Sequence, residues 1–455
     1  MATNWFPLLI SHLLFLSFPI SVSSLQNLYE VDVHSLMPSN VCSSPKDTKP
    51  RLRVVDRYSP CSALPQPQSF SHEQILSNDQ LRVDSIQGHI SAVSGRAKNS
   101  DPLASSKITA QYGGSFGIAN YIVSIGIGTP SKTLTVAFDT GSDVTWIQCE
   151  PCQQYCYPQL ESIFDPSQSS TFANVSCNSN PCKDVGYDCL GSSCLYGVLY
   201  GDGSYTLGYY AEDTLTITPD VISNFRFGCG QNNNGTFGGI AGLLGLGPAS
   251  ESFVSQTSYK YNRVFAYCLP ALSSSTGYLN FGTDSNLPNT QRTPIPKSPR
   301  SPFYYYLNMT GLSVAGESLK IQSKVFSKAG TIIDSGTVIT RLPPDAYKAL
   351  RSKFRKRMKQ YKMAPSFSLF DTCYDFTGLD SVLIPSVGVQ FLNNVTLDLD
   401  PNGILYVLDI SQVCLAFASN RRRTDLGIFG NVQQRTFNVV YDVPNGEIGF
   451  SSEAC

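Results

Sequence analysis

Apolar and polar residues alternate over much of the chain after residue 120, which is the pattern of half-buried β-strands. The alternation is clear in residues 120–130, NYIVSIGIGTP, and in residues 132–138, KTLTVAF. Near the C-terminus, residues 437–450, FNVVYDVPNGEIGF, contain two such runs on either side of a Pro-Asn-Gly turn, which is typical of a β-hairpin. We therefore expect the body of the protein to be all-β.

One helix is predicted before this body, in residues 71–94, SHEQILSNDQLRVDSIQGHISAVS. Ser71 is a favourable N-cap, and a glutamate follows soon after it. The apolar face is expected to consist of Ile75, Leu81, Ile86 and Ile90.

The clearest helix of the body is predicted in residues 343–362, PPDAYKALRSKFRKRMKQYK, which begins with proline. Its apolar stripe comprises Tyr347, Leu350, Phe354, Met358 and Tyr361. Its other face is basic, with Lys348, Arg351, Lys353, Arg355, Lys356, Arg357, Lys359 and Lys362. A basic face can bind nucleic acid. A solvated outer face is the preferred interpretation, because no aromatic platform is interleaved with these charges.

The first residues have the pattern of a secretory signal. Residues 6–24, FPLLISHLLFLSFPISVSS, form an apolar block that ends in small residues, so we expect residues 1–24 to be a signal peptide cut near Ser24. An uncleaved anchor is the alternative, although no second stretch of about 18 apolar residues follows. Four sequons agree with secretion and predict glycosylation at Asn174, Asn234, Asn308 and Asn394.

Charge and cysteine content narrow the class of protein. The chain has 33 basic and 34 acidic residues, so its net charge directs it toward neither nucleic acid nor an anionic membrane. Its 14 cysteines are typical of an oxidising, extracellular environment. Cys42 and Cys61 lie apart from the other twelve, which run from Cys149 to Cys455. This division predicts a removable prosegment, residues 25–110, with a small independent domain as the alternative.

Two acidic residues occur in the same unusual setting. Asp139 in VAFDTGSDVTWIQC and Asp334 in GTIIDSGTVIT each follow an apolar run and precede a Ser/Thr-Gly-Ser/Thr sequence. Burying a carboxylate costs several kcal/mol unless it is neutralised or hydrogen-bonded. The glycines permit tight turns, and four nearby hydroxyl groups are candidate donors: Thr140, Ser142, Ser335 and Thr337. The repeat predicts two duplicated lobes, residues 111–295 and 296–455, that bring both acids to one axis.

These residues resemble the pepsin-like aspartic proteases. Asp139-Thr140-Gly141-Ser142 and Asp334-Ser335-Gly336-Thr337 match the two catalytic loops of that family. Trp146 and Tyr200 match a tryptophan and a flap tyrosine that bond to each other in the family. Residues 243–247, LLGLG, and 428–431, IFGN, match the elements that close the two loops. The resemblance runs from about Tyr121 to the C-terminus and implies a bilobal β-rich fold with a cleft between the lobes.

The cysteines between the first loop and Tyr200 resemble the cysteine-rich insertion of the atypical plant aspartic proteases. This nepenthesin-like group includes the chloroplast nucleoid protease type. The resemblance implies the pairs Cys149-Cys152, Cys156-Cys229, Cys177-Cys194, Cys182-Cys189, Cys268-Cys455 and Cys373-Cys414, although sequence alone leaves the connectivity open. A zinc or redox role for the C-x-x-C sequence at Cys149 is the competing interpretation.

The resemblance implies a secreted aspartic endopeptidase, made as a zymogen and active in acid, with Asp139 and Asp334 as the catalytic pair. Substrate contacts are expected from Gly141, Ser142, Trp146, Tyr200, Gly336 and Thr337. The expected partners are peptide substrates, with no metal, cofactor, membrane or nucleic acid, and the expected state is a monomer in the apoplast or vacuole. A lysine or arginine of the prosegment is expected to pair with the two aspartates until acid protonates them.

Two rival functions remain open at this point. The first is an inactive binding protein on the same fold, as in the plant xylanase inhibitors, whose catalytic motifs are damaged. The second is a DNA-associated plastid protease, motivated by the basic helix at residues 348–362. The signal-like start favours the apoplast or vacuole over a plastid.

Overall fold

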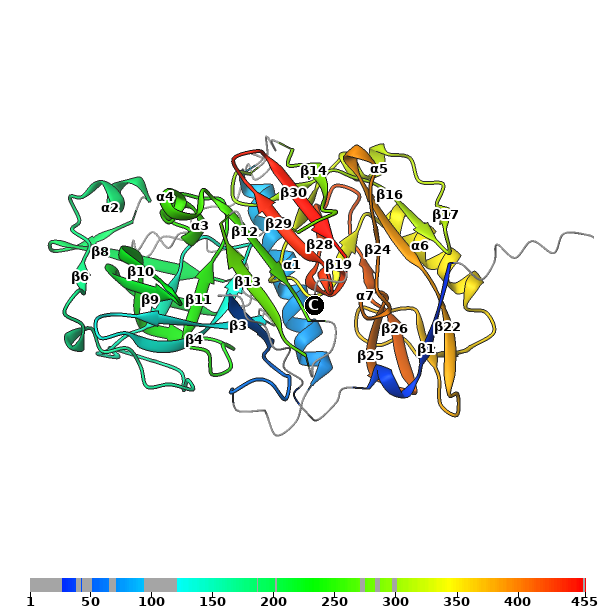
Figure 1. Ribbon diagram of the computed structural model, residues 1–455, viewed down its shortest axis with the longest axis horizontal. Helices are drawn as coiled ribbons and strands as arrows, with labels where there is room; N and C mark the ends of the chain where they lie inside the picture. The colour runs from blue at the N-terminus through cyan, green and yellow to red at the C-terminus, as the bar shows by residue number, and fades with distance from the viewer. Residues whose placement is uncertain are drawn as a thin grey trace, which may run out of the picture.

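The computed structural model describes residues 27–37, 42, 51–64, 71–93, 121–185, 187–200, 203–270, 275–282, 287–296, 301–452 and 455. The expected signal peptide lies outside these residues. The described part of the chain is mostly β, as the alternation predicted, and it forms two lobes that lie left and right in Figure 1.

The largest described sheet has 15 strands and contains the body strands expected from the sequence. Its neighbours run in the order β14 (Gln291–Pro294), β30 (Glu447–Ser451), β29 (Asn438–Asp442), β12 (Val264–Cys268), β13 (Gly277–Phe281), β2 (Leu52–Asp56), β3 (Tyr121–Ile127), β4 (Lys132–Asp139), β11 (Gly242–Gly245), β5 (Trp146–Gln148), β10 (Asp220–Asn234), β9 (Tyr205–Ile217), β8 (Ser193–Leu199) and β7 (Cys189–Leu190), with β6 (Ala173–Asn174) on β9. The expected C-terminal hairpin is β29 and β30, and it joins this sheet by pairing with β12. The sheet therefore connects both halves of the chain.

The C-terminal lobe is built from three smaller sheets. The first contains β15 (Tyr306–Leu307), β18 (Thr331–Ile333), β28 (Gly427–Phe429), β19 (Thr340–Leu342) and β27 (Phe417–Ser419). The second contains β17 (Glu317–Ser318), β16 (Met309–Val314), β23 (Val387–Phe391) and β24 (Val395–Asp398). The third contains β20 (Lys362–Ala364), β21 (Cys373–Asp375), β26 (Gln412–Leu415) and β25 (Leu405–Asp409).

The described helices are short apart from two. They are α1 (His72–Val93), α2 (Asn180–Asp184), α3 (Phe253–Gln256), α4 (Ser258–Tyr261), α5 (Lys324–Ser327), α6 (Pro344–Arg357) and α7 (Pro401–Ile404). The prediction of α6 was too long at its end, because the chain leaves the helix at Met358 and residues 362–364 pair with β21 instead. None of the helices in the described ranges is long and apolar enough to cross a membrane.

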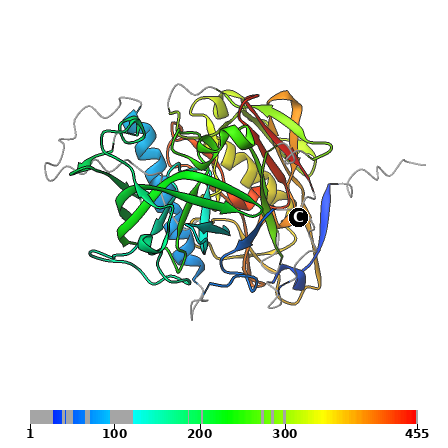
Figure 2. The ribbon, with the colours of Figure 1, turned by 60° about the vertical axis from the view of Figure 1, so that its left-hand side comes forward.

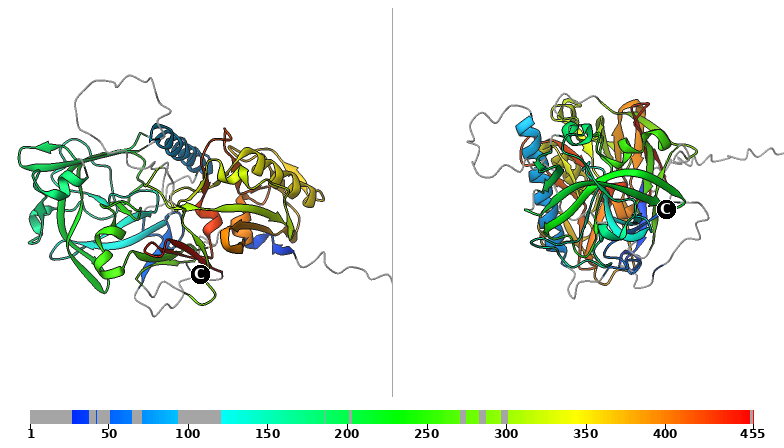
Figure 3. Two further views of the ribbon diagram at one scale, coloured as in Figure 1. Left: turned by 90° about the horizontal axis from the view of Figure 1, so that it is seen from above. Right: turned by 90° about the vertical axis from the view of Figure 1, so that its left-hand side faces the viewer.

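The N-terminal segment is integrated into the fold. Its strand β1 (Leu28–Asp32) pairs with β22 (Ser381–Pro385), and β2 lies inside the large sheet between β13 and β3. Seen from above, helix α1 lies along one side of the molecule where the two lobes meet (Figure 3, left), and Figure 2 shows it beside the strands of the N-terminal lobe. Ile75, Ile86 and Ile90 are buried as predicted, but Leu81 was wrongly assigned to the apolar face, since it is 41% exposed.

The disulfides of the cysteine-rich insertion differ from the expected pairs. In the structure Cys149 bonds to Cys229 and Cys152 bonds to Cys156, so the expected Cys149-Cys152 and Cys156-Cys229 pairs were wrong. The reason is the pairing of β5 with β10, in which Ile147 lies opposite Cys229. This places the buried Cys149 beside the buried Cys229 and leaves the two outer cysteines to bond to each other.

Burial also distinguishes the two disulfides formed by Cys177, Cys182, Cys189 and Cys194. Cys182 bonds to Cys194, both buried, and Cys177 bonds to Cys189 nearer the surface. The expected Cys177-Cys194 and Cys182-Cys189 pairs were therefore wrong. The structure contains the expected Cys268-Cys455 and Cys373-Cys414 bonds, and it joins Cys42 to Cys61 in the N-terminal segment. Since all four cysteines near C-x-x-C are bonded, the zinc or redox interpretation has no free thiols.

Three of the four sequon asparagines are exposed, and the fourth, Asn308, is half-buried. All four lie at or near the surface, where a glycan can be attached, so glycosylation stays a prediction for each of them.

Candidate active site

The loop that carries Asp139 begins where β4 ends. Strand β4 runs parallel to β11, with Asp139 opposite Gly245, and the Asp139 carbonyl accepts a hydrogen bond of 2.9 Å from the Leu246 N–H. The side chain of Asp139 is fully buried. The N–H of Gly141 donates to its Oδ1 at 2.9 Å, so the turn itself stabilises the charged carboxylate.

The loop that carries Asp334 follows β18 in the same way. Strand β18 runs parallel to β28, and the Asp334 N–H donates to the Phe429 carbonyl at 3.1 Å. Asp334 is also fully buried, and its Oδ1 accepts from the Gly336 N–H at 2.9 Å. The Thr337 hydroxyl donates to Oδ2 at 2.6 Å, and this second donor from the loop has no counterpart at Asp139 among the described residues.

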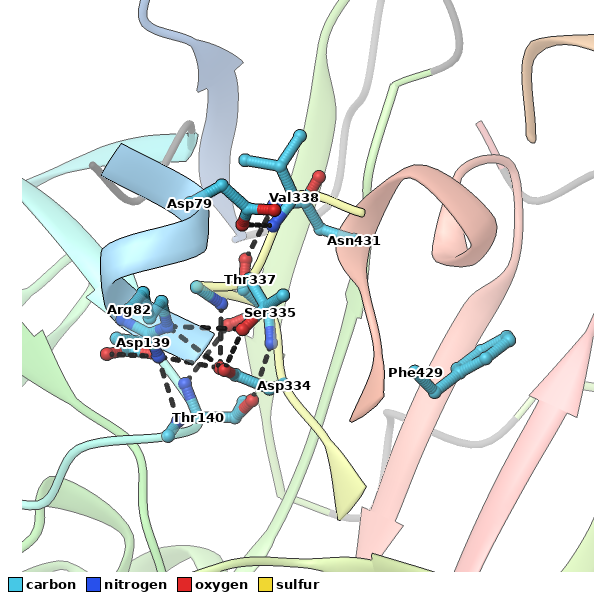
Figure 4. A network of polar contacts seen from close by, with 12 residues as sticks. Asp79, Arg82, Asp139, Thr140, Asp334, Ser335, Thr337, Val338, Phe429 and Asn431 are labelled. Carbon is cyan, nitrogen blue, oxygen red and sulfur yellow. Dashed lines mark hydrogen bonds and ion pairs between the residues drawn. The ribbon is translucent and has the colours of Figure 1, made fainter. Parts of the chain in front are cut away.

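The two loops are bonded to each other, which brings the carboxylates together (Figure 4). The Thr140 N–H donates to the Ser335 hydroxyl at 3.0 Å, and the Ser335 N–H donates to the Thr140 hydroxyl at 2.9 Å. A Cβ at Gly141 would lie 2.6 Å from Oδ1 of Asp334, and a Cβ at Gly336 would lie 2.5 Å from Oδ1 of Asp139. The glycines are therefore required by the close approach of the opposite carboxylate.

One guanidinium group from α1 contacts both acids. Nη2 of Arg82 lies 2.8 Å from Oδ1 of Asp139 and 2.8 Å from Oδ1 of Asp334. Its Nε donates to Oδ2 of Asp334 at 3.0 Å. All three side chains are fully buried, so the attraction between them is little screened by water.

The two carboxyl groups differ in pKa, although their loops are alike. Burial raises the pKa of Asp139 to about 6, against the opposing attraction of Arg82. Burial also acts to raise the pKa of Asp334, but the ion pair with Arg82 and the hydrogen bonds from Thr337 and Gly336 together lower it below its ordinary value. As the pH falls, Asp139 therefore takes the first proton while Asp334 stays ionised.

Trp146 and Tyr200 form a pair beside the first loop. Nε1 of Trp146 donates to the Tyr200 hydroxyl at 2.6 Å, which is the bond that the resemblance implied. The Phe237 ring packs against both, with centroid distances of 5.1 Å to Trp146 and 6.0 Å to Tyr200. Arg57 of the N-terminal segment donates to the Phe237 carbonyl at 2.9 Å, so this segment also contacts the aromatic group.

The structure brings together the two aspartates, both glycines and Thr337, and it bonds Trp146 to Tyr200 as expected, but the Ser142 hydroxyl takes no part in these contacts. The Ser142 hydroxyl is buried and has no hydrogen-bond partner among the described residues. A basic residue of the prosegment was expected to pair with the two aspartates, and the structure shows that this residue is Arg82 of α1, which the sequence alone did not single out. Asp79 of the same helix was missed altogether. The two residues share a face with Ile75 and Ile86, and Arg82 is the sole lysine or arginine of α1. A charged pair that interrupts an apolar stripe was the available signal.

Comparison with known proteins agrees with this geometry. Two bonded aspartate loops between two β-rich lobes define a pepsin-like fold. Family models described as xylanase inhibitor N-terminal and C-terminal match residues 121–283 and 304–452. The structure of basic 7S globulin from soybean has a TM-score of 0.59 and 21% identity, covering 73% of this chain and 91% of that one, which shows the fold alone.

Curated relatives are closer in sequence. "Aspartyl protease AED1" of Arabidopsis thaliana is 47% identical over 434 residues, which cover 94% of this chain and 92% of the relative. "Aspartic proteinase nepenthesin-2" of Nepenthes gracilis is 37% identical over 350 residues, covering 74% of this chain and 78% of the relative. The chain belongs to the pepsin-like aspartyl protease family of plants, in its nepenthesin-like and AED-like branch.

Proposed function

We propose that the protein is an aspartic endopeptidase that is synthesised as an inactive precursor. The observation that carries the proposal is the contact of one nitrogen atom, Nη2 of Arg82, with both Asp139 and Asp334 at 2.8 Å. Two carboxylates that share one donor atom lie near each other, and we expect them to share one proton once that donor leaves.

The chemistry follows from this pair. Two neighbouring carboxyl groups cannot both ionise easily, so in acid one keeps a proton. The ionised member acts as general base on a water molecule, which attacks the peptide carbonyl. The protonated member donates a hydrogen bond to the carbonyl oxygen and stabilises its developing charge. The chemistry needs no covalent enzyme intermediate, and the titration belongs to the pair rather than to either residue.

Latency has a direct physical basis in this proposal. Residues 25–110 are the prosegment, and α1 lies over the two loops with the Arg82 side chain fully buried against them. A substrate would have to occupy the same space and to use the same carboxylate oxygens. The lobes, residues 111–295 and 296–455, then form the mature enzyme, which the proposal places outside the cell after removal of residues 1–24.

The proposal is tested by acidifying the purified full-length chain and adding a denatured protein substrate. We expect proteolysis that pepstatin blocks and that Asp139→Asn abolishes. Proteolysis that persists in Asp139→Asn would mean that another protease or another mechanism is responsible.

An inactive inhibitor is the second candidate, because the matching family models are described by xylanase inhibition. The intact pairing of both loops argues for catalysis, since an inhibitor has no need of buried, hydrogen-bonded carboxylates. Inhibition of a xylanase by the acid-treated chain, without any proteolysis, would favour the inhibitor. Nucleic-acid binding is disfavoured by the ion pairs that Lys353 and Arg357 of α6 form with Glu317.

A further inference from the structure

A second polar contact joins α1 to the body beside the catalytic pair. Oδ1 of Asp79 accepts a hydrogen bond from the Val338 N–H at 2.6 Å, and Oδ2 accepts one from the Ile339 N–H at 3.3 Å. Nη2 of Arg341 donates to the same Oδ2 at 2.8 Å. The side chains of Asp79 and Arg341 are 0% and 1% exposed, so this is a buried ion pair (Figure 4 shows Asp79 and Val338).

The groups that hold Asp79 all belong to the proposed mature enzyme. Val338 and Ile339 directly follow the Asp334 loop, and Arg341 lies on β19. Within the body, Nη1 of Arg341 donates to the Ile339 carbonyl at 2.7 Å, which fixes the guanidinium beside the two N–H groups. Its Nε is buried and has no hydrogen-bond partner among the described residues.

Removal of α1 would leave this guanidinium without a counter-charge. Among the described residues Asp79 is the one carboxylate in an ion pair with Arg341, and Gln80, its other side-chain acceptor, is also on α1. With α1 gone, the guanidinium would face the space that the helix had filled, where another carboxylate can replace that of Asp79. Two backbone N–H groups and a fixed guanidinium form a set of donors that fits a carboxylate. The site is therefore built for an anion that α1 supplies only in the precursor.

The distance of the site from the catalytic pair indicates which residue of a bound substrate could reach it. Asp79 and Arg82 are three residues apart on α1, which corresponds to a rise of about 4.5 Å. An extended peptide rises about 3.3 Å per residue. A carboxylate in the Asp79 position would thus belong to a residue about one to three positions from the scissile bond.

We propose that Val338, Ile339 and Arg341 form a carboxylate subsite that takes an aspartate or glutamate side chain of the substrate. Asp79 occupies this subsite in the precursor. The identification of the occupant as a substrate side chain rests on the proposed proteolytic function, whereas the carboxylate site itself does not.

The site is tested first in the full-length chain, without any catalysis. Asp79→Ala leaves a space of carboxylate size next to Arg341, and we expect acetate to raise the melting temperature of this variant by about 2 °C or more, while acetamide does not. Asp84→Ala is the matched control, because Asp84 lies on the same helix as Asp79 but forms an exposed ion pair, with Arg421 of the body. Equal effects of acetate and acetamide on Asp79→Ala would overturn the site.

The group that binds at the site in the mature enzyme is tested with the wild-type chain after acid activation, so the preference itself is measured without any variant. Peptides with glutamate or glutamine at each of three positions on either side of the cut are compared at pH 5, where the peptide glutamate is mostly ionised. We expect kcat/KM to be about tenfold or more higher for glutamate at one position, and Arg341→Met to remove the preference.

The outcomes separate the two proposals. Cleavage of glutamate and glutamine peptides at equal rates would overturn the acidic-substrate assignment while leaving the protease intact. Cleavage of neither peptide would contradict the proposed function. The acetate experiment would still test whether the site binds a carboxylate, because it does not depend on catalysis.

Discussion

The loops of Asp139 and Asp334 have the same pattern of residues, but their hydrogen bonds differ. In both loops a glycine N–H donates to the aspartate, at 2.9 Å in each case. Only the second loop adds a hydroxyl donor, Thr337, while the Ser142 hydroxyl at the matching position has no partner among the described residues. The backbone frame is therefore shared, and the ion pair with Arg82 together with the added Thr337 bond makes Asp334 the more acidic member.

The two loops differ further in what they contact. Seven residues beyond Asp139 stands Trp146, which bonds to Tyr200 within its own lobe. Seven residues beyond Asp334 stands Arg341, which bonds to Asp79 of α1. The apolar face of α1 also packs on the C-terminal lobe, in clusters with Ile339, Phe370, Tyr304, Tyr306 and Ile332. The helix thus docks on the C-terminal lobe and contacts the first catalytic loop through Arg82.

The largest effect is expected when the aspartate of either loop is replaced. We expect Asp139→Asn and Asp334→Asn each to lower kcat/KM by about 1,000-fold or more, because the pair acts as a unit. The measurement is peptide hydrolysis by the acid-activated chain. Asp143→Asn is the matched control, since burial raises the pKa of Asp143 to about 8 and the neutral amide resembles the acid that is present at working pH. A large loss in one aspartate variant alone would contradict a shared mechanism.

The next effect concerns the one side chain of α1 that bonds to both loops. Arg82→Met should weaken docking of α1 by about 3 kcal/mol, or about 100-fold, because it leaves two buried carboxyl groups without their counter-charge. The measurement is proteolytic activity near pH 6 without prior acid treatment, which should rise. Arg421→Gln is the control, because its ion pair with Asp84 is exposed and is expected to contribute little. Unchanged latency in Arg82→Met would contradict the role of this contact.

The pH dependence sharpens the contrast between the two acids. The ion pair with Arg82 favours the charged form of both acids, so we expect protonation of the pair to weaken the docking of α1 as the pH falls. Asp139, with a pKa of about 6, is protonated first. Because its pKa lies above the ordinary 3.8, its protonation between pH 6 and 4 favours the folded chain. The stability that the lowered pKa of Asp334 contributes is lost only below about its ordinary value of 3.8.

We therefore expect α1 to loosen before the protein unfolds. Hydrogen exchange of residues 72–93, corrected for its intrinsic pH dependence, should become faster as the pH falls from 7 to 4. Over the same range, the titration of Asp139 and Asp334 should not lower the melting temperature. Arg82→Met should show no such pH dependence. Exchange that slows toward pH 4 in the wild type would contradict the assignment.

Local patterns predicted much of this site, and long-range contacts account for what was missed. The strands, the two loops and the Trp146–Tyr200 pair could be predicted because each is encoded within a short stretch that also resembles a family. The contact of Arg82 with Asp334 spans 252 residues, so no local pattern specifies it. The pairing of Cys149 with Cys229 depends likewise on how β5 aligns with β10. Leu81 was misplaced because Arg82 takes the buried position beside it.

The smallest effect tests the hydroxyl that distinguishes the loops. Thr337→Val removes the 2.6 Å bond to Asp334, and because that bond favours the charged carboxylate, its loss should raise the pKa of Asp334. The acidic limb of the kcat/KM profile should then move to higher pH, with a loss of stability of about 1–3 kcal/mol. Ser142→Ala is the matched variant and should leave the limb within about 0.2 pH units, since no described residue bonds to this hydroxyl. Equal shifts in the two variants would show that the catalytic pair is symmetric once α1 has left.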